Sequence, residues 1–244
     1  MRRGEERAIN QVPRPVLVLL AAALALQIGW QALQPKPSAQ AEALAAPPSQ
    51  PVLRAVSLGE PIALAQWLTL YLQAFDNQPG ISIPFNDLDY PRVLLWLETL
   101  LGLDPVAEYP LMMASQLYGQ VPDQARQRLM FDFVRRKFLE DPDRRWRWLA
   151  HCAILAKHRL KDTALALKYA EDITRHARAA SGWARQMRIF ILEDMGELES
   201  ATVLLGGLLA SGEVTDSREI YFLTQRLEEL KNAEKSSLPS KNRQ

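Results

Sequence analysis

Two Asp-Pro dipeptides, Asp104-Pro105 and Asp141-Pro142, most strongly constrain the fold of this chain. Each follows one stretch of apolar residues with helical spacing and precedes another. Proline has a fixed φ and no backbone N–H, so the first turn of a helix accepts it, and it disfavours helical geometry in the residue before it. Each dipeptide therefore predicts that one helix ends and another begins.

Other prolines and glycines mark the remaining helix boundaries, because glycine readily takes the left-handed conformation that ends a helix. The prolines at or near the start of apolar-periodic stretches are Pro61, Pro91, Pro110 and Pro122. The glycines at which such stretches break are Gly182, Gly196 and Gly212. The predicted helices lie near 58–76, 90–103, 106–120, 122–140, 143–158, 161–178, 182–195, 197–211 and 215–233.

Large apolar residues recur at helical spacing within these stretches, which predicts faces buried against neighbouring helices. The stripe in the first of them consists of Trp67, Leu68, Tyr71, Leu72 and Phe75. The short segment 81–83 is the one strand-like stretch, and three residues are too few for a sheet. The predicted fold class is all-α.

Composition narrows the function classes. The chain has 29 basic and 28 acidic residues, so no overall field favours nucleic acid. Its single cysteine, Cys152, excludes an intramolecular disulfide and a Cys-based zinc cluster. No common catalytic or phosphate-binding motif is present. His151 and His158 lie two helical turns, about 10 Å, apart, too far to share one ion. We expect no enzymatic activity, cofactor, metal or small-molecule substrate.

The amino-terminal segment has the composition of a membrane anchor. Residues 16–26 are wholly apolar, and the hydrophobic stretch continues to Leu33, about 18 residues that just span a bilayer core of ~30 Å. The preceding basic residues are Arg2, Arg3, Arg7 and Arg14. By the positive-inside rule, residues 1–14 are expected in the cytoplasm, 15–33 in the membrane and the rest outside. This predicts a single-pass protein of a bacterial inner membrane with a periplasmic domain.

A cleavable signal peptide is the alternative interpretation of the same segment. Residues 39–41, Ala-Gln-Ala, have the small-x-small form of a cleavage site. That site lies farther past the apolar stretch than is usual, and Trp30 resembles an interfacial anchor. Both observations favour a retained anchor.

The remaining chain is predicted to contain a linker, a helical domain and a tail. Residues 34–52 combine five prolines with Ala, Ser and Gln and show no amphipathic period, which predicts a spacer. The helical domain is expected over 53–233, and residues 234–244 are expected to form a disordered tail.

The segments after the two Asp-Pro dipeptides resemble the tetratricopeptide repeat family, whose units of about 34 residues carry a W-x2-L-G-x2-Y pattern in the first helix. The matching positions are Leu111, Ala114, Ser115 and Tyr118 in one segment, and Trp148, Cys152 and Leu155 in the other, with His151 at the consensus leucine. Lys161-Asp162 and Gly196-Glu197, 35 residues apart, resemble the turns between the two helices of a unit, as Trp148 and Trp183 resemble equivalent packing positions.

The resemblance covers roughly residues 90–211, about three units, the usual minimum for burying a core. It implies a superhelical array of α-α hairpins, with the helix 215–233 as a cap. Arg185 and Gln186 depart from it, since apolar packing residues are expected at their positions.

Arrays of this family bind extended peptides or helices in a groove lined by the first helix of each hairpin. Carried over by spacing, the groove residues are Met112, Gln116, Gln120, Trp146, Leu149, Lys157 and Arg188. Trp146 and Arg188 are the main candidates, because Trp and Arg dominate interface energetics. The resemblance thus implies a non-enzymatic scaffold or adaptor that docks a protein partner, in an envelope assembly or secretion machinery.

A basic, Trp-containing cluster over 135–148 adds a second candidate surface. Its members are Arg135, Arg136, Lys137, Arg144, Arg145, Trp146, Arg147 and Trp148. Three interpretations of these cations are open: they compensate helix dipoles, they contact an acidic protein, or they bind a cell-envelope polymer or anionic lipid. Arg144 and Arg145 are the candidates for contact with a protein. The long connection 76–90 either packs its own apolar residues or contacts a partner.

Overall fold

The protein is almost entirely α-helical in the computed structural model, which describes residues 12–34 and 41–237. This confirms the all-α prediction for the described part of the chain. The α-helices are α1 (Arg14–Leu33), α2 (Gln50–Val56), α3 (Pro61–Ala74), α4 (Tyr90–Leu103), α5 (Tyr109–Met112), α6 (Gln124–Glu140), α7 (Pro142–His158), α8 (Thr163–His176), α9 (Gly182–Asp194), α10 (Leu198–Ser211) and α11 (Ser217–Ser237).

Helix α1 is long and apolar enough to cross a membrane. It has 20 residues and a mean hydropathy of 2.0, and none of its side chains is buried. Its bounds agree with the apolar segment predicted at 15–33. Residues 1–11, with three of the four predicted orienting arginines, lie outside the described residues. Helix α1 and the array from α2 to α11 belong to different compact units, so each is described by itself.

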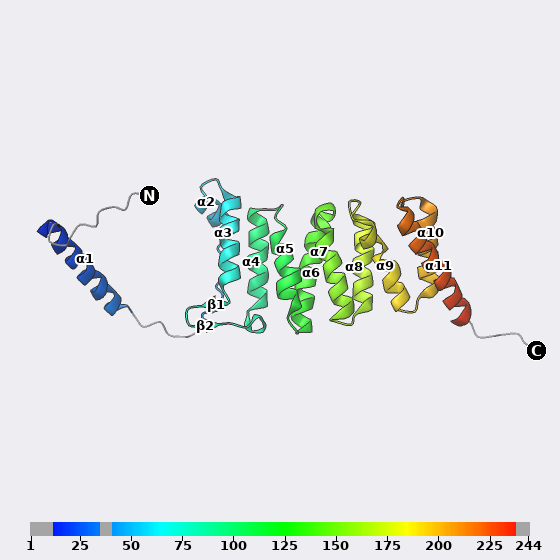
Figure 1. The fold of residues 1–244 in the computed structure, drawn as a ribbon, viewed down its shortest axis with the longest axis horizontal. Helices are drawn as coiled ribbons and strands as arrows, with labels where there is room; N and C mark the ends of the chain where they lie inside the picture. Colours follow the sequence, from blue (N-terminus) through cyan, green and yellow to red (C-terminus); the bar gives the residue numbers. More distant parts are fainter. Residues whose placement is uncertain (1–11, 35–40, 238–244) are drawn as a thin grey trace, which may run out of the picture. The chain divides into compact units, whose positions relative to one another are not determined.

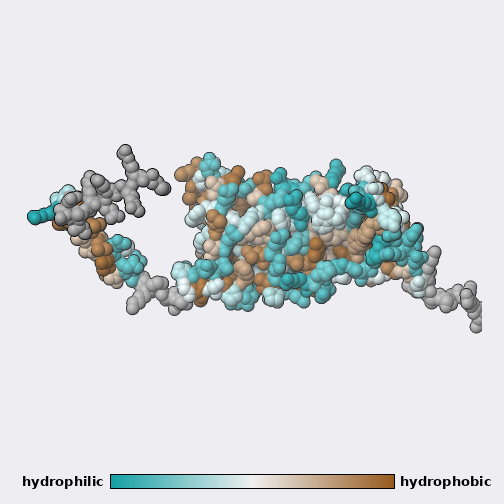
Figure 2. All heavy atoms as spheres, viewed as in Figure 1, coloured by the Kyte–Doolittle hydropathy of each residue, from teal (hydrophilic) through white to brown (hydrophobic). Residues whose placement is uncertain are grey.

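Helices α2 to α11 stand side by side, and most helices pack on the next one in the chain (Figure 1). One core cluster runs through the array from Leu44 to Ile191, and a smaller one lies under α9, α10 and α11. The largest fully buried side chains of the main cluster are aromatic: Tyr90, Tyr118, Tyr169, Phe131, Phe133 and Phe138. Polar and charged residues cover much of the face in Figure 2, with hydrophobic atoms over α2 and the start of α3.

The prolines mark helix starts as predicted, with one informative exception. Proline occupies the first turn of α3, α4, α5 and α7. The second Asp-Pro both ends α6 and begins α7. The first one ends α4 but does not begin α5, which starts at Tyr109 after a turn. Pro110 occupies the first turn of α5, and Pro105 lies in the turn between α4 and α5.

Two interhelical turns that were matched by sequence each contain a residue with positive φ. Lys161 and Gly196, 35 residues apart, both have positive φ, 56° and 79°. Each turn leads directly into a helix, α8 or α10. Gly212 caps α10 in the left-handed conformation as predicted. Gly182 differs, since it is the first residue of α9 and does not end α8.

The predicted helix 106–120 is irregular. Helix α5 is short and continues into the π-helical η3 (Met113–Leu117) and the 3-10 helix η4 (Tyr118–Gln120). Gly119 makes this path possible, because a Cβ atom there would lie 2.7 Å from the Ala114 carbonyl oxygen and 2.9 Å from Phe131. Wide π turns of this kind occur frequently at functional sites.

The spacer prediction is wrong for residues 42–52, which pack on the array. Leu44 is buried in the main core cluster. Arg92 Nη1 donates to the Leu44 carbonyl at 2.9 Å, and Trp96 Nε1 donates to the Ala45 carbonyl at 2.8 Å. Gln50 already begins α2. Leu44, the two donors on α4 and a hydrogen bond from Gln50 Nε2 to the Thr99 carbonyl thus hold a segment whose composition is typical of a linker.

Two further boundaries differ from the predictions. Helix α11 runs to Ser237, so residues 234–237 are helical where the disordered tail over 234–244 was predicted. Residues 238–244 of that tail and residues 35–40 of the linker lie outside the described part. The strand-like segment pairs after all, because β1 (Asn77–Gln78) and β2 (Ile81–Ser82) form a two-stranded hairpin. After the hairpin, Ile83 packs on the core, as does Phe85, the first residue of η2 (Phe85–Asp87). These contacts support the interpretation that the connection 76–90 packs its own apolar residues.

Candidate partner-binding surface

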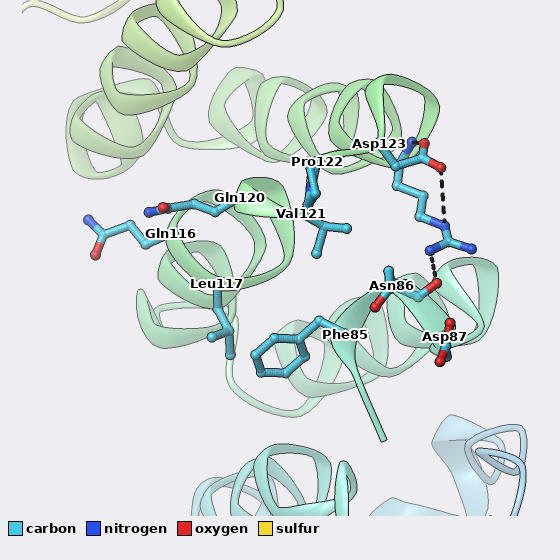
Figure 3. A pocket seen from close by; sticks show the side chains of 10 residues that line it. Phe85, Asn86, Asp87, Gln116, Leu117, Gln120, Val121, Pro122 and Asp123 are labelled. Carbon is cyan, nitrogen blue, oxygen red and sulfur yellow. Dashed lines mark hydrogen bonds and ion pairs between the residues drawn. The ribbon is translucent and has the colours of Figure 1, made fainter. Parts of the chain in front are cut away.

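A hollow of about 880 Å³ lies between η2, η4 and the start of α6 (Figure 3). We call it the η2 pocket. Its lining residues are Phe85, Asn86, Asp87, Gln116, Leu117, Gln120, Val121, Pro122, Asp123 and Arg126. Figure 3 shows the two glutamine side chains on one side, the acidic residues on the other, and Phe85 with Leu117 between them.

The wall of the η2 pocket is held by Arg126. Its guanidinium group bonds to the Asn86 carbonyl, lies 3.8 Å from the Asp123 carboxylate and stands 5.2 Å from the centre of the Tyr90 ring. Burial raises the pKa of Tyr90 to about 12, so its hydroxyl stays protonated and donates to the Tyr118 carbonyl at 3.0 Å. The titratable side chains that line this pocket are Asp87, Asp123 and Arg126.

A second hollow, of about 270 Å³, lies between α7 and α9, and we call it the α7–α9 groove. Its lining residues are Ala153, Ile154, Lys157 and His158 of α7, and Trp183, Met187, Phe190 and Ile191 of α9. Trp183 is 53 % exposed, which is unusual for so large an apolar side chain. The groove is therefore an apolar surface open to solvent.

Two contacts close the ends of the α7–α9 groove. The rings of Trp146 and Trp183 meet edge to face with their centres 5.7 Å apart, and the Arg147 guanidinium carbon lies 5.7 Å from the Trp146 ring centre. At the other end, Lys157 of α7 forms an ion pair with Asp194 of α9. Both pairs join residues 37 apart in sequence, so the two helices lie parallel and in a fixed register.

A third hollow, of about 550 Å³, lies between α3 and α5 and was not predicted. Leu70 and Tyr109 are its large, exposed apolar residues. The sequence signal that could have revealed it is the position of Leu70, which is offset from the buried residues Leu68 and Leu72 of the same helix.

The predicted groove residues fall into separate places. Gln116 and Gln120 line the η2 pocket, whereas Lys157 lines the α7–α9 groove and Trp146 borders it. The other half-buried or exposed candidates are Met112, Arg144 and Arg188. Arg144 pairs with Asp141 at 3.0 Å. Within the described part of the chain, the buried Nε atom of Arg188 has no hydrogen-bond partner.

Leu149 and Arg145 are buried, so the prediction that they contact a partner is wrong. Leu149 lies in the main core, and Arg145 is 4 % exposed. Arg145 donates to the Lys137 carbonyl at 2.6 Å and the Pro105 carbonyl at 2.7 Å, and pairs with Glu140 at 3.1 Å. This guanidinium group therefore joins the end of α6, the turn after α4 and the start of α7.

The basic cluster over 135–148 is largely neutralised. Its ion pairs are Arg135–Asp172 at 2.6 Å, Arg136–Glu98 at 3.1 Å, Lys137–Glu140 at 2.7 Å, Arg144–Asp141 at 3.0 Å and Arg147–Glu108 at 3.7 Å. With Arg145 buried and paired as well, each cation in the cluster has an acidic neighbour. Little net positive charge remains for a polyanion.

Two titratable residues of α7 are fully or half buried. Cys152 is fully buried, and burial raises the pKa of its thiol, which keeps the sulfur protonated and unreactive. Desolvation lowers the pKa of the half-buried His151. Over residues 12–34 and 41–237, no group of three His, Cys, Asp or Glu side chains could hold a metal ion.

Comparison of the chain with models of known protein families, with curated proteins and with solved structures finds no match.

Proposed function

We propose that this protein is a non-enzymatic, membrane-anchored scaffold that binds another protein in the α7–α9 groove. The observation that carries this proposal is an apolar hollow of about 270 Å³ beside an exposed tryptophan, Trp183. Exposed apolar surface with a hollow is typical of a site that meets another protein, and Trp is enriched among the residues that dominate such contacts.

The groove is built to bind without rearrangement. The contact between Trp146 and Trp183 fixes one end, and the ion pair between Lys157 and Asp194 fixes the other. Helices α7 and α9 are in addition each packed on α8. Because little has to be ordered on binding, more of the burial energy appears as affinity.

One exposed cation beside the groove is only weakly paired. Lys157, which lines the groove, is paired with Asp194, whereas the exposed Arg147 lies at the tryptophan end of the groove. The nearest acid to Arg147 is Glu108, at 3.7 Å, in a pair that is exposed on the arginine side and therefore weak. We infer that the partner segment carries a large apolar side chain for the hollow and an acidic residue that meets Arg147.

The cellular setting follows from the sequence. The resemblance to tetratricopeptide repeats supports a partner-binding array. Arg2, Arg3 and Arg7 before α1, and Arg14 at its first position, support a cytoplasmic amino terminus. The array would then be periplasmic in a bacterium, as part of an envelope assembly or secretion machinery. The alternative, binding of an envelope polymer or anionic lipid by the cluster 135–148, is disfavoured because the cations there are paired.

The test places photo-crosslinking residues at Met187 in the groove and at Val203 on α10, in the full-length chain in intact membranes. Val203 is the control, since it is exposed and lies outside the groove. We expect one protein to crosslink at Met187 and not at Val203, and Trp183→Ala to abolish the crosslink. If the same species attaches at both sites, or if Trp183→Ala leaves its yield unchanged, the groove is not the binding site.

A further inference from the structure

The first two helices of the array carry almost no charge. Of residues 43–75, only Arg54 and Glu60 are charged. The large apolar side chains exposed in this region, apart from Leu70 in the hollow between α3 and α5, are Val52, Val56, Leu58, Ile62, Trp67 and Tyr71. We call this the α2–α3 face, and part of it is visible as hydrophobic surface in Figure 2. Contiguous apolar patches are rare on soluble monomers and mark contact with a protein or a membrane.

The face is the outer side of the first helices in the row. Helix α3 buries Ala65, Leu68 and Leu72 toward α4 and α2, and Trp67 points away from them, 64 % exposed. The sequence stripe predicted that Trp67 is buried, which is wrong. Among the described residues no further helix of the array covers this side (Figure 1), so the aromatic ring meets whatever lies next to the array.

The turn between α2 and α3 holds an apolar side chain out into solvent. Leu58 is 91 % exposed and has a positive φ of 51°. The turn is fixed by hydrogen bonds, in which Glu60 N donates to the Ser57 carbonyl at 2.8 Å and Ser57 Oγ donates to the Arg54 carbonyl at 2.7 Å. Positive φ is uncommon in a non-glycine residue and is an outlier for a bulky one such as leucine.

We propose that the α2–α3 face lies on the surface of the lipid bilayer. The proposal rests on α1 being a retained membrane anchor. Ten residues lie between Leu33, the end of α1, and Leu44, which is packed in the core. Such a connection spans at most about 40 Å even when fully extended. The first helices of the array therefore cannot leave the neighbourhood of the membrane, and they are the uncharged ones.

The composition of the face suits the interfacial region of a bilayer. Trp and Tyr favour the level of the lipid headgroups, and apolar side chains such as Leu58 enter the acyl boundary. Arg54, the one cation on the face, is compatible with lipid phosphates, and Glu60 is its one acid. The α7–α9 groove lies several helices farther along the row and would stay free for its partner (Figure 1).

The test uses the full-length chain in nanodiscs with lipids that carry a spin-label quencher near the headgroup. An environment-sensitive fluorophore is attached at Leu58→Cys, Trp67→Cys or Tyr221→Cys, in separate samples. Cys152 is fully buried and stays unlabelled. Tyr221 is the control, because it is exposed to the same degree as Trp67 but lies on α11. We expect quenching at positions 58 and 67 to exceed that at 221 at least threefold.

Two further readouts separate the possible failures. If positions 58 and 67 are quenched no more than position 221, the proposal is wrong. Protection of both labels from aqueous iodide would then show that the face is covered by protein, either a second copy of this chain or a partner. A label at Trp30→Cys in α1 reports the anchor itself. If only position 30 is quenched, α1 is in the membrane but the α2–α3 face does not contact the lipid. If position 30 is not quenched, α1 is not a membrane anchor, and this proposal is wrong for that reason.

Discussion

Arg135 of α6 and Asp172 of α8 form an ion pair of 2.6 Å across 37 residues of sequence. The Trp146–Trp183 contact joins α7 to α9 at the same interval. Equivalent turns lie 35 residues apart, so the contacting residues are offset by two positions. Two residues rotate a helix by about 200°. That offset is required, because in a row of parallel helices the side that faces the next helix is opposite to the side that faces the previous one.

Loss of Arg135 is expected to destabilise the array. The Asp172 side chain is only 10 % exposed, so Arg135→Ala leaves an unpaired, nearly buried carboxylate. We expect the free energy of unfolding to fall by about 1–3 kcal/mol. The measurement is urea unfolding of the full-length chain in detergent, followed by circular dichroism. Arg136→Ala is the matched control, because its pair with Glu98 is exposed and contributes little. Equal losses in both variants would contradict the structural role of the Arg135 pair.

Arg145 should be required for folding and not for partner binding. Arg145→Met removes hydrogen bonds to the Lys137 and Pro105 carbonyls and leaves both without this donor. We expect a loss of about 2–4 kcal/mol of unfolding free energy. Arg144→Met, one residue away and exposed, should change stability by less than about 1 kcal/mol. A large loss of partner crosslinking in an Arg145 variant that unfolds normally would show that this residue contacts the partner after all.

Leu44 is expected to hold the segment 42–49 against α4. Leu44→Asp places a carboxylate in the core position of an apolar side chain, and we expect a loss of about 2–4 kcal/mol. Limited proteolysis of the full-length chain should then cut within 42–49 at least ten times faster. Ala43→Asp is the control, since Ala43 is exposed beside it. If both variants are cut at the same rate, the segment is not held by its leucine.

His151 should make the fold sensitive to mild acid. Desolvation lowers its pKa in the folded state below the value of about 6.5 expected for the unfolded chain. Above pH 6.5 both states are neutral at this group and stability is complete. As the pH falls below 6.5, the unfolded chain binds the proton first, so stability declines toward the folded pKa. His151→Gln should flatten this decline in unfolding free energy between pH 7 and 5. An unchanged slope in His151→Gln would contradict the prediction.

The order of helices could be predicted from the sequence because its determinants are local. Pro142 has a fixed φ and disfavours helical geometry in the residue before it, so α6 ends there. Lys161 and Gly196, both with positive φ, lie 35 residues apart in matching turns. The apolar composition of α1 is likewise a local property. Such features act through the covalent chain and its nearest neighbours, so the sequence by itself determined an all-α chain of helices with an apolar amino-terminal helix.

The tertiary structure alone decided which side chains are available for binding. Arg145 is buried because carbonyl groups of Lys137 and Pro105, from two other segments, converge on it, and no periodicity encodes that meeting. Leu44 lies in a proline-rich segment typical of a spacer, yet α4 supplies donors for its backbone. Trp67 belongs to a helical stripe but lies where the row of helices begins. Burial depends on what lies beside a residue in space, which for each of these three is set by contacts between segments distant in sequence.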